Sequence, residues 1–287
     1  MMKVLTAITV IENNDLKKEV EVGEEILKMY GTNIYIEMGE KITIKDLLYG
    51  LLLRSGNDAS MTLAINTSSS IDDFVSLMNL KAKEIGMTNS IFSNPHGLND
   101  DTKNYSTAYD LALLSKYVYQ NPIYREIAST KKYTTSTGDK TYLWYNRNKL
   151  LTDYKYCTGG KNGYTPEAGK TLITTASKDN LNLTIVTLKD SNPFTNHKNL
   201  YEYFYDVYKN YTIVDKNNFY IDKEFYDKKL YLKKSFTYPL MEKEVEDIST
   251  KIVIDNKKYP SNQVGIINIY LKNKKIGTVK IYAKTNN

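Results

Sequence analysis

The sequence contains very little cysteine and histidine. Cys157 is its only cysteine, and His96 and His197 are its only histidines. One cysteine cannot form an intrachain disulfide or a thiolate metal cluster. A histidine-based zinc site or a Ser-His-Asp triad would have to use one of two histidines that lie in different types of segment. We therefore expect neither a metal site nor a cofactor in this chain.

Long hydrophobic runs are also missing. Because no stretch of 18 apolar residues occurs, no part of the chain is expected to span a membrane. Met1-Met2-Lys3 leads into an amphipathic helix, without the apolar core and small-residue cleavage site of a secretory signal peptide. Taken literally, this is the sequence of a soluble cytoplasmic protein.

Arginine is scarce as well. Only three of the 39 basic residues are arginine, and the formal net charge is +6. This composition indicates a lysine-rich coding bias, whereas a nucleic-acid-binding protein would cluster arginine and lysine on one face. We expect no nucleic-acid partner, although the mild positive charge suits anionic polymers of a cell envelope.

Helices are predicted where apolar residues recur every three or four positions between capping residues. Thr43 with Asp46 is a capping pair, Ser70 and Gly86 bracket another helix, and Pro122 suits a first helical position. The first predicted helix begins without a cap. The predicted helices cover residues 3–13, 44–53, 58–65, 71–85, 107–119 and 196–208, with one more from residue 122.

Strands are predicted where apolar and polar residues alternate. In the first two thirds of the chain they cover residues 131–135, 141–145, 171–176 and 182–188, with hairpin loops at 136–139 and 177–180. From about residue 213 only strands are predicted, over 229–232, 251–254, 264–271 and 276–282, the last two joined by a four-residue loop at 272–275. A chain of 287 residues has room for two domains. We predict a mixed domain over residues 1–209 and a small β-sandwich over 210–287.

Three short runs carry residues suited to acyl transfer: residues 1–3, which end in Lys3, then Ser55-Gly56-Asn57, and residues 161–165, which begin with Lys161. Acyl transfer needs a nucleophile, a base within hydrogen-bond reach, donors for the oxyanion and a cation for a substrate carboxylate. A lysine three positions after a serine lies on the same helix face. Any one of these runs alone would be an ordinary helix end, turn or strand entry.

Together, and in this order, these runs resemble the D-alanyl-D-alanine carboxypeptidases of the low-molecular-weight penicillin-binding proteins, peptidase family S11. The resemblance covers roughly residues 1 to 195, and the segment after it resembles that family's C-terminal domain more loosely. Six runs in one order are a specific signal. They are residues 1–7, 53–59, 94–98, 106–112, 146–151 and 160–165.

The resemblance implies an α+β fold, with a β-lactamase/transpeptidase-like domain whose antiparallel sheet has helices on both sides, followed by a small all-β sandwich. It implies a bacterial cell-wall hydrolase, involved in peptidoglycan biosynthesis and cell shape, that removes the terminal D-alanine of stem pentapeptides and is inhibited by β-lactams. It also implies location in the cell envelope for the full-length protein, and membrane association only in that form.

The resemblance further assigns roles to residues of this chain. Lys3 is expected to be the general base, with Ser55 and Asn57 as the second catalytic motif. Lys161 is expected to anchor the substrate carboxylate, and the Tyr164 N–H to donate to the oxyanion.

Three further residues complete this set of expectations. Asn162 stands where the family usually has threonine, so its amide would have to donate to the carboxylate in place of a hydroxyl. Gly163 would permit close backbone approach. His96, between Pro95 and Gly97, is expected to hold its loop through hydrogen bonds.

The nucleophilic serine of this pattern would be the residue immediately before Met1, and it is not in the chain. In one interpretation the protein is an active carboxypeptidase, and the serine, the first strands and a signal peptide lie upstream of an internal Met codon. In the other it is a non-catalytic remnant that binds peptidoglycan or a partner. The first is favoured because Ser55, Asn57 and Lys161 are intact, although Asn162 departs from the pattern.

Overall fold

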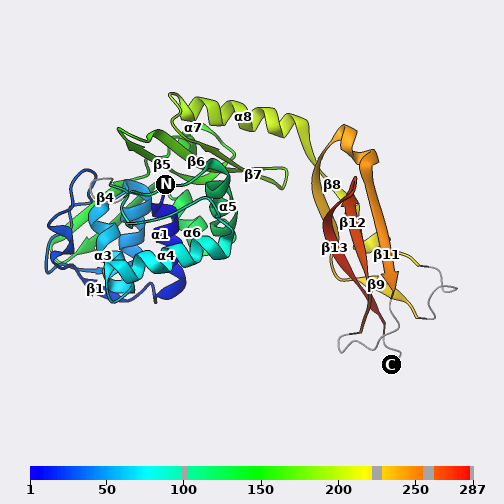
Figure 1. The fold of residues 1–287 in the computed structure, drawn as a ribbon, viewed down its shortest axis with the longest axis horizontal. Helices are drawn as coiled ribbons and strands as arrows, with labels where there is room; N and C mark the ends of the chain where they lie inside the picture. The colour runs from blue at the N-terminus through cyan, green and yellow to red at the C-terminus, as the bar shows by residue number, and fades with distance from the viewer. Residues whose placement is uncertain (99–102, 222–227, 255–261, 285–287) are drawn as a thin grey trace. The chain divides into compact units, whose positions relative to one another are not determined.

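The computed structural model describes residues 1–98, 103–221, 228–254 and 262–284 (Figure 1). Contacts between residues divide the chain into two compact units. The first comprises Met1–Lys178 and Asn182–Tyr201, and the second comprises Asp179–Leu181 and Glu202–Asn287. The predicted division into domains at residues 209 and 210 stays a prediction.

The helices of the first unit begin where the sequence places capping residues. The side chains of Thr43, Ser70 and Thr107 each accept a hydrogen bond from a backbone N–H in the first turn of the helix that follows. The predicted helices are therefore confirmed, with small shifts at their ends. They are α1 Lys3–Asn13, α2 Ile44–Tyr49, α3 Asn57–Thr67, α4 Ile71–Ile85, α5 Ala108–Val118, α6 Pro122–Ser129 and α8 Pro193–Val207. A short helix that was not predicted, α7, covers Leu150–Asp153.

Helix α1 runs through the interior of the first unit. Every residue from Lys3 to Ile11 is buried, including the polar Thr6 and Thr9. Helices α3, α4, α5 and α6 all contact it. A helix surrounded on every side does not need an amphipathic pattern. Its first turn carries Lys3 into the interior, at the end where the chain begins.

The predicted helix over 44–53 changes geometry halfway. Helix α2 continues into a π-helical turn over Gly50–Arg54, and Ser55 then takes a left-handed conformation with φ of 70°. Gly50 packs closely there, since a Cβ on it would lie 2.6 Å from the Ile34 side chain. Single π turns inside helices are frequent at functional sites. Here the turn places Ser55 just ahead of α3.

A three-stranded sheet lies beside the helices, with strand order β5 (Cys157–Thr165), β6 (Gly169–Lys178) and β7 (Leu181–Thr187). Strand β5 pairs antiparallel with β6 and forms one edge. Ile173 of β6 packs into the helical core. Its neighbour Thr174 points to the opposite face, where its hydroxyl lies 2.7 Å from His197 and 2.8 Å from the Tyr201 hydroxyl of α8. Helices therefore cover both faces, as predicted (Figure 1).

Short strands and turns complete the first unit. A two-stranded ribbon pairs β1 (Glu19–Glu21) with β2 (Lys41–Thr43), separated by a 3₁₀ turn at Glu24–Ile26. The predicted hairpin is β3 (Lys132–Thr137) with β4 (Lys140–Tyr145), and its loop contains only residues 138 and 139. The four-residue loops predicted between β3 and β4 and between β6 and β7 are wrong. In each hairpin the strands extend further toward the turn than predicted and leave a two-residue loop.

The second unit contains two antiparallel sheets. One pairs β8 (Tyr208–Val214) with β10 (Phe236–Met241), and the other has the order β11 (Ile248–Ile254), β12 (Gln263–Leu271), β13 (Lys274–Ala283) and β9 (Leu230–Leu232). Short 3₁₀ helices cover Lys216–Asn218 and Glu242–Asp247. Both sheets contribute to one apolar cluster, as in a β-sandwich. The four-residue loop predicted between β12 and β13 is wrong: two residues suffice, because Lys272 adopts a positive φ of 53°.

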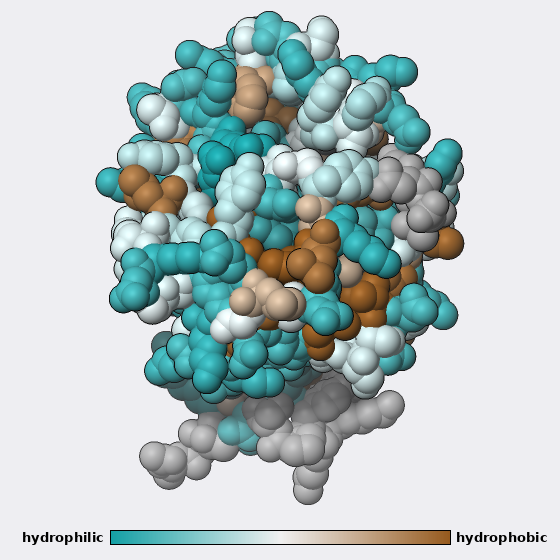
Figure 2. All heavy atoms as spheres, turned by 90° about the vertical axis from the view of Figure 1, so that its left-hand side faces the viewer, coloured by the Kyte–Doolittle hydropathy of each residue, from teal (hydrophilic) through white to brown (hydrophobic). Residues whose placement is uncertain are grey.

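No helix in the described part of the chain is long and apolar enough to cross a membrane. On the face drawn in Figure 2, hydrophobic side chains gather near the middle and hydrophilic ones surround them.

Gly160 on β5 provides a test of how tightly this strand packs on β6. Its φ is 146°, and a Cβ would lie 2.3 Å from the Ile173 carbonyl oxygen. We expect Gly160→Ala to lower the free energy of unfolding by about 2–4 kcal/mol, since the clash adds to the backbone strain. Urea denaturation would measure the loss.

Gly138→Ala is the matched control for this test. Gly138 also has a positive φ, 54°, but a Cβ there would meet no atom within 4 Å. This variant should lower the free energy of unfolding by the backbone strain alone, about 1 kcal/mol. Equal losses in the two variants would contradict the close packing at Gly160.

Candidate active site

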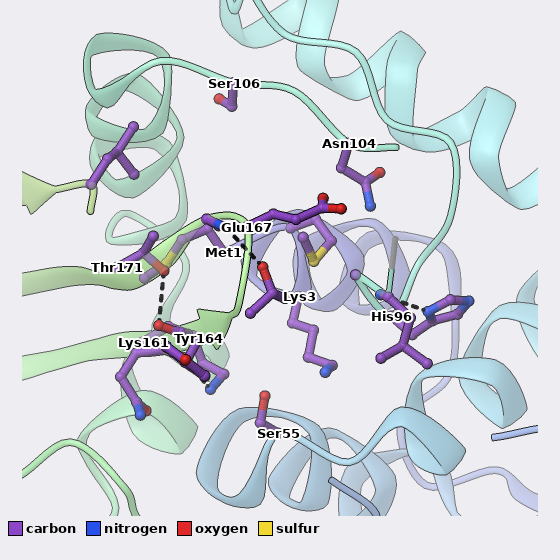
Figure 3. Close-up of a pocket in the computed structure, with 18 of the residues that line it drawn as sticks. Met1, Lys3, Ser55, His96, Asn104, Ser106, Lys161, Tyr164, Glu167 and Thr171 are labelled. Atoms are coloured by element: carbon purple, nitrogen blue, oxygen red, sulfur yellow. Dashed lines mark hydrogen bonds between the residues drawn. The ribbon is translucent and has the colours of Figure 1, made fainter. Parts of the chain in front are cut away.

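A cavity of about 580 Å³ lies where the start of α1, the turn before α3 and the edge strand β5 meet (Figure 3). The loops around His96, Asn104 and Arg147 complete its walls. All the residues to which the sequence assigned a role in catalysis or substrate binding line it: Lys3, Ser55, Asn57, Lys161, Asn162, Gly163 and Tyr164. The structure thus brings together three runs that are far apart in the sequence.

Lys3 is buried at the floor of this cavity, with 7% of its surface exposed. Its Nζ donates a hydrogen bond of 2.6 Å to Oδ1 of Asn57. Burial lowers the pKa of Lys3 to about 7; Asp58 opposes the shift and Arg147 adds to it. Near neutral pH a large share of this amine is uncharged and can accept a proton.

The start of α3 holds the Asn57 amide in place. Asn57 Nδ2 donates to the Tyr30 carbonyl oxygen at 2.7 Å, which leaves Oδ1 facing Lys3. The neighbouring Asp58 carboxylate accepts the backbone N–H groups of Ile34 and Tyr35 at 2.8–3.0 Å. Burial raises the Asp58 pKa, and these N–H groups act against that rise. These hydrogen bonds fasten the segment 30–35 to the start of α3.

Lys161 is buried on β5, with 2% of its surface exposed, and its Nζ donates to the Asn162 carbonyl oxygen at 2.9 Å. Burial, followed by the charges of Lys3 and Arg147, holds its pKa well below the ordinary value. A cation crowded by other cations gains from the arrival of an anion. This arrangement can bind a carboxylate.

Strand β5 presents its open edge to the same cavity. At Gly163, a Cβ would lie 2.9 Å from the Thr171 hydroxyl and 3.4 Å from the Met1 nitrogen. The Tyr164 side chain is 69% exposed. An open strand edge offers N–H and C=O groups to an extended peptide. The site can therefore combine backbone pairing with carboxylate binding.

The loop that contains His96 is held by its own polar groups. His96 Nδ1 accepts the Leu98 N–H at 3.1 Å, and Asn94 Oδ1 accepts the Gly97 N–H at 2.6 Å. Ser60 of α3 donates to the Pro95 carbonyl oxygen at 2.6 Å. Only the first of these contacts is made by His96, and Asn94 and Ser60 provide the other two.

Arg147 also lines the cavity, although no role was predicted for it from the sequence. Its N–H donates to the Leu53 carbonyl oxygen at 3.2 Å, and its guanidinium donates to the Thr32 hydroxyl at 3.3 Å. Asn148 anchors the same segment by donating to the Gly159 carbonyl oxygen at 3.2 Å. Two features of the sequence could have pointed to Arg147. It lies in the run 146–151, and it is one of only three arginines in the sequence.

Comparisons with known proteins identify the family of this chain. The family model for D-alanyl-D-alanine carboxypeptidase, Peptidase_S11, matches residues 1–192. The chain is 36% identical over 199 residues to D-alanyl-D-alanine carboxypeptidase DacF of Bacillus subtilis, covering 67% of this chain and 51% of that protein. It is 31% identical to the D-alanyl-D-alanine carboxypeptidase of Streptomyces sp. strain K15, covering 61% of this chain and 66% of that protein. The chain therefore spans between half and two thirds of these relatives.

Solved structures show the same fold. The D-alanyl-D-alanine carboxypeptidase DacD of Francisella tularensis matches with a TM-score of 0.73 at 23% identity, covering 99% of this chain and 86% of that one. The carboxypeptidase of Mycobacterium tuberculosis H37Rv matches with a TM-score of 0.69 at 28% identity, covering 72% and 80%. The α+β expectation is confirmed.

Proposed function

Because the chain belongs to the D-alanyl-D-alanine carboxypeptidase family, we propose that its cavity binds the D-Ala-D-Ala end of peptidoglycan stem peptides for hydrolysis through a serine acyl-enzyme. One observation carries the proposal. A buried lysine with a lowered pKa, hydrogen-bonded to Asn57, shares one cavity with a second buried lysine on an open strand edge.

The proposed nucleophile is a serine directly before Met1. The Met1 nitrogen lies against Gly163 of β5, so a residue attached to it would stand inside the cavity beside Lys3. Its hydroxyl would attack the carbonyl carbon between the two D-alanines while the neutral Lys3 amine takes the hydroxyl proton. The Tyr164 N–H and the N–H of the serine would stabilise the oxyanion. Lys3 would pass this proton to the departing D-alanine amine, and water would then hydrolyse the acyl-enzyme, which releases the shortened peptide and restores the serine hydroxyl.

The carboxylate of the terminal D-alanine would bind between Lys161 and Arg147. Both side chains line the cavity. A carboxylate between them would offset the repulsion that Arg147 exerts on the Lys161 ammonium, and it would accept charge-assisted hydrogen bonds from both. The Asn162 amide would donate one hydrogen bond where the family usually has a hydroxyl. β-Lactams, which present a carboxylate next to a reactive carbonyl, would bind in the same place as inhibitors.

The proposed substrate lies in the cell envelope, so we propose that the full-length protein works there. The net charge of +6 on the present 287 residues favours approach to anionic envelope polymers.

Carboxylate recognition can be tested without catalysis. We expect the chain to bind a diacetylated L-Lys-D-Ala-D-Ala peptide more tightly than the same peptide with a C-terminal amide. Lys161→Met should weaken binding of the carboxylate form by about ten- to a hundredfold, since a charge-assisted hydrogen bond is lost. NMR titration would measure both dissociation constants.

Lys83→Met is the matched control, because Lys83 lies exposed on α4 outside the cavity. It should leave both dissociation constants unchanged. Equal binding of the carboxylate and amide peptides to the unmodified chain would contradict the proposed role of the cavity.

A further inference from the structure

The charges that line the cavity are distributed unevenly. Among the described residues of its wall the basic side chains are Lys3, Arg147, Lys161 and Lys189, and the one carboxylate belongs to Glu167. The buried lysines, Lys3 and Lys161, lie on the floor, on α1 and β5. Glu167 is exposed in the turn between β5 and β6. A ligand that complements this pattern carries an anion at one end and a cation further along.

The turn that carries Glu167 is well defined. The Thr165 hydroxyl accepts the Ala168 N–H at 3.1 Å, and Thr165 pairs with Gly169 at the end of the β5–β6 ladder. In Figure 3 the Glu167 side chain extends from this turn across the cavity toward Asn104.

Asn104 is itself fixed on the other side of the cavity. Its Oδ1 accepts the Ser93 N–H at 2.8 Å, and its Nδ2 donates to Asn94 Oδ1 at 3.0 Å. The Glu167 carboxylate therefore lies between two anchored walls.

The proposed function fixes the direction of the peptide, and this step rests on it. With the terminal carboxylate at Lys161 and the scissile carbonyl at the Tyr164 N–H, the rest of the stem peptide continues past Thr165 toward the turn. The residue before the D-Ala-D-Ala pair lies about 3.3 Å further along. Its side chain, about four methylenes long in a diamino acid, can reach the Glu167 carboxylate.

We propose that Glu167 is a specificity-determining residue that recognises the side-chain ammonium of the diamino acid preceding D-Ala-D-Ala. The carboxylate pairs with this cation at the mouth of the cavity while Lys161 and Arg147 hold the opposite end of the peptide. An uncharged residue at this position of the peptide loses the pairing and keeps the rest of the contacts.

The test compares two peptides on the full chain by NMR titration. Both are Nα-acetyl-L-Lys-D-Ala-D-Ala, one with a free ε-amine and one with an Nε-acetyl group. The free amine should bind about two- to fivefold more tightly, the range expected of an exposed ion pair. The preference should shrink as salt is raised. Glu167→Gln should remove the preference and leave the affinity for the Nε-acetyl peptide unchanged.

Glu19→Gln is the matched control. Glu19 is exposed on β1 and does not line the cavity, so this substitution removes the same charge at a distance from the site. It should retain the preference. Equal binding of the two peptides to the unmodified chain, or a preference that survives Glu167→Gln, would overturn the role of Glu167.

A third peptide separates this proposal from the proposed function. It is the free-amine peptide with a C-terminal amide. If the carboxylate peptides bind better than this amide but the ε-amine makes no difference, only the role of Glu167 is wrong. If the C-terminal carboxylate makes no difference, or no peptide binds, the proposed function fails and the role of Glu167 fails with it.

Discussion

A form of this protein that carries a serine directly before Met1 is expected to be acylated by a fluorescent penicillin, whereas the chain itself is not. The serine would be supplied on an N-terminal extension added to this chain. Removing the nucleophile of a serine hydrolase lowers the rate by about a millionfold. Covalent labelling after denaturing electrophoresis would measure the difference.

The control for this experiment is the same extended protein with alanine in place of the added serine. It should fold like the serine form and remain unlabelled. Labelling of the chain without the extension would contradict the proposed position of the nucleophile, and Ser55→Ala would then show whether Ser55 supplies the hydroxyl. The in-frame codons upstream of the Met1 codon provide an independent test. A serine codon there supports the active enzyme, and a stop codon supports the non-catalytic interpretation.

Local interactions explain which parts of the fold could be predicted from the sequence. Helix α4 has the predicted bounds because Ser70 caps its first turn and Gly86 adopts the left-handed conformation at its end. Helix α1 was found from its apolar spacing alone. Both signals lie within the segment they define, so no knowledge of the rest of the chain was needed.

The turn lengths were wrong for a physical reason. Asp179, Asn180 and Lys272 all adopt positive φ, which costs a non-glycine residue about 1–2 kcal/mol. The hydrogen bonds between the paired strands that these turns connect offset this cost. Because the pairing between strands is a property of the whole sheet, composition near the turn predicted longer loops.

The π-helical turn at Gly50 and the additional cavity residues depend on contacts that are distant in the sequence. Gly50 packs against Ile34 and Trp144. Arg147 and Glu167 acquire significance only because their loops converge on the cavity formed by α1 and β5. The motif residues could be named in advance because their order matches a known family, but the charge pattern around them required the structure.

The second large effect is expected at Lys3. In the serine-containing form, Lys3→Met should lower the acylation rate by about a hundred- to ten-thousandfold, the usual contribution of a general base. In the serine-containing form that retains Lys3, the acylation rate should rise with pH and reach half its maximum near pH 7. The reason is that the Lys3 pKa is lowered to about 7 and only the neutral amine accepts a proton. An ordinary lysine would place this rise more than three units higher. Stopped-flow acylation across pH 5–10 would measure the profile.

Asn57→Asp tests the cause of this pH dependence. The substitution places a carboxylate where Oδ1 of Asn57 now lies, 2.6 Å from the Lys3 Nζ. A nearby anion favours the charged amine and raises its pKa, so the rise in rate should move to higher pH. Lys83→Met, on the exposed face of α4, should leave the profile in place. A folded Asn57→Asp protein with an unshifted profile would show that another group controls the rate, because any titration of Lys3 must respond to a charge at this distance.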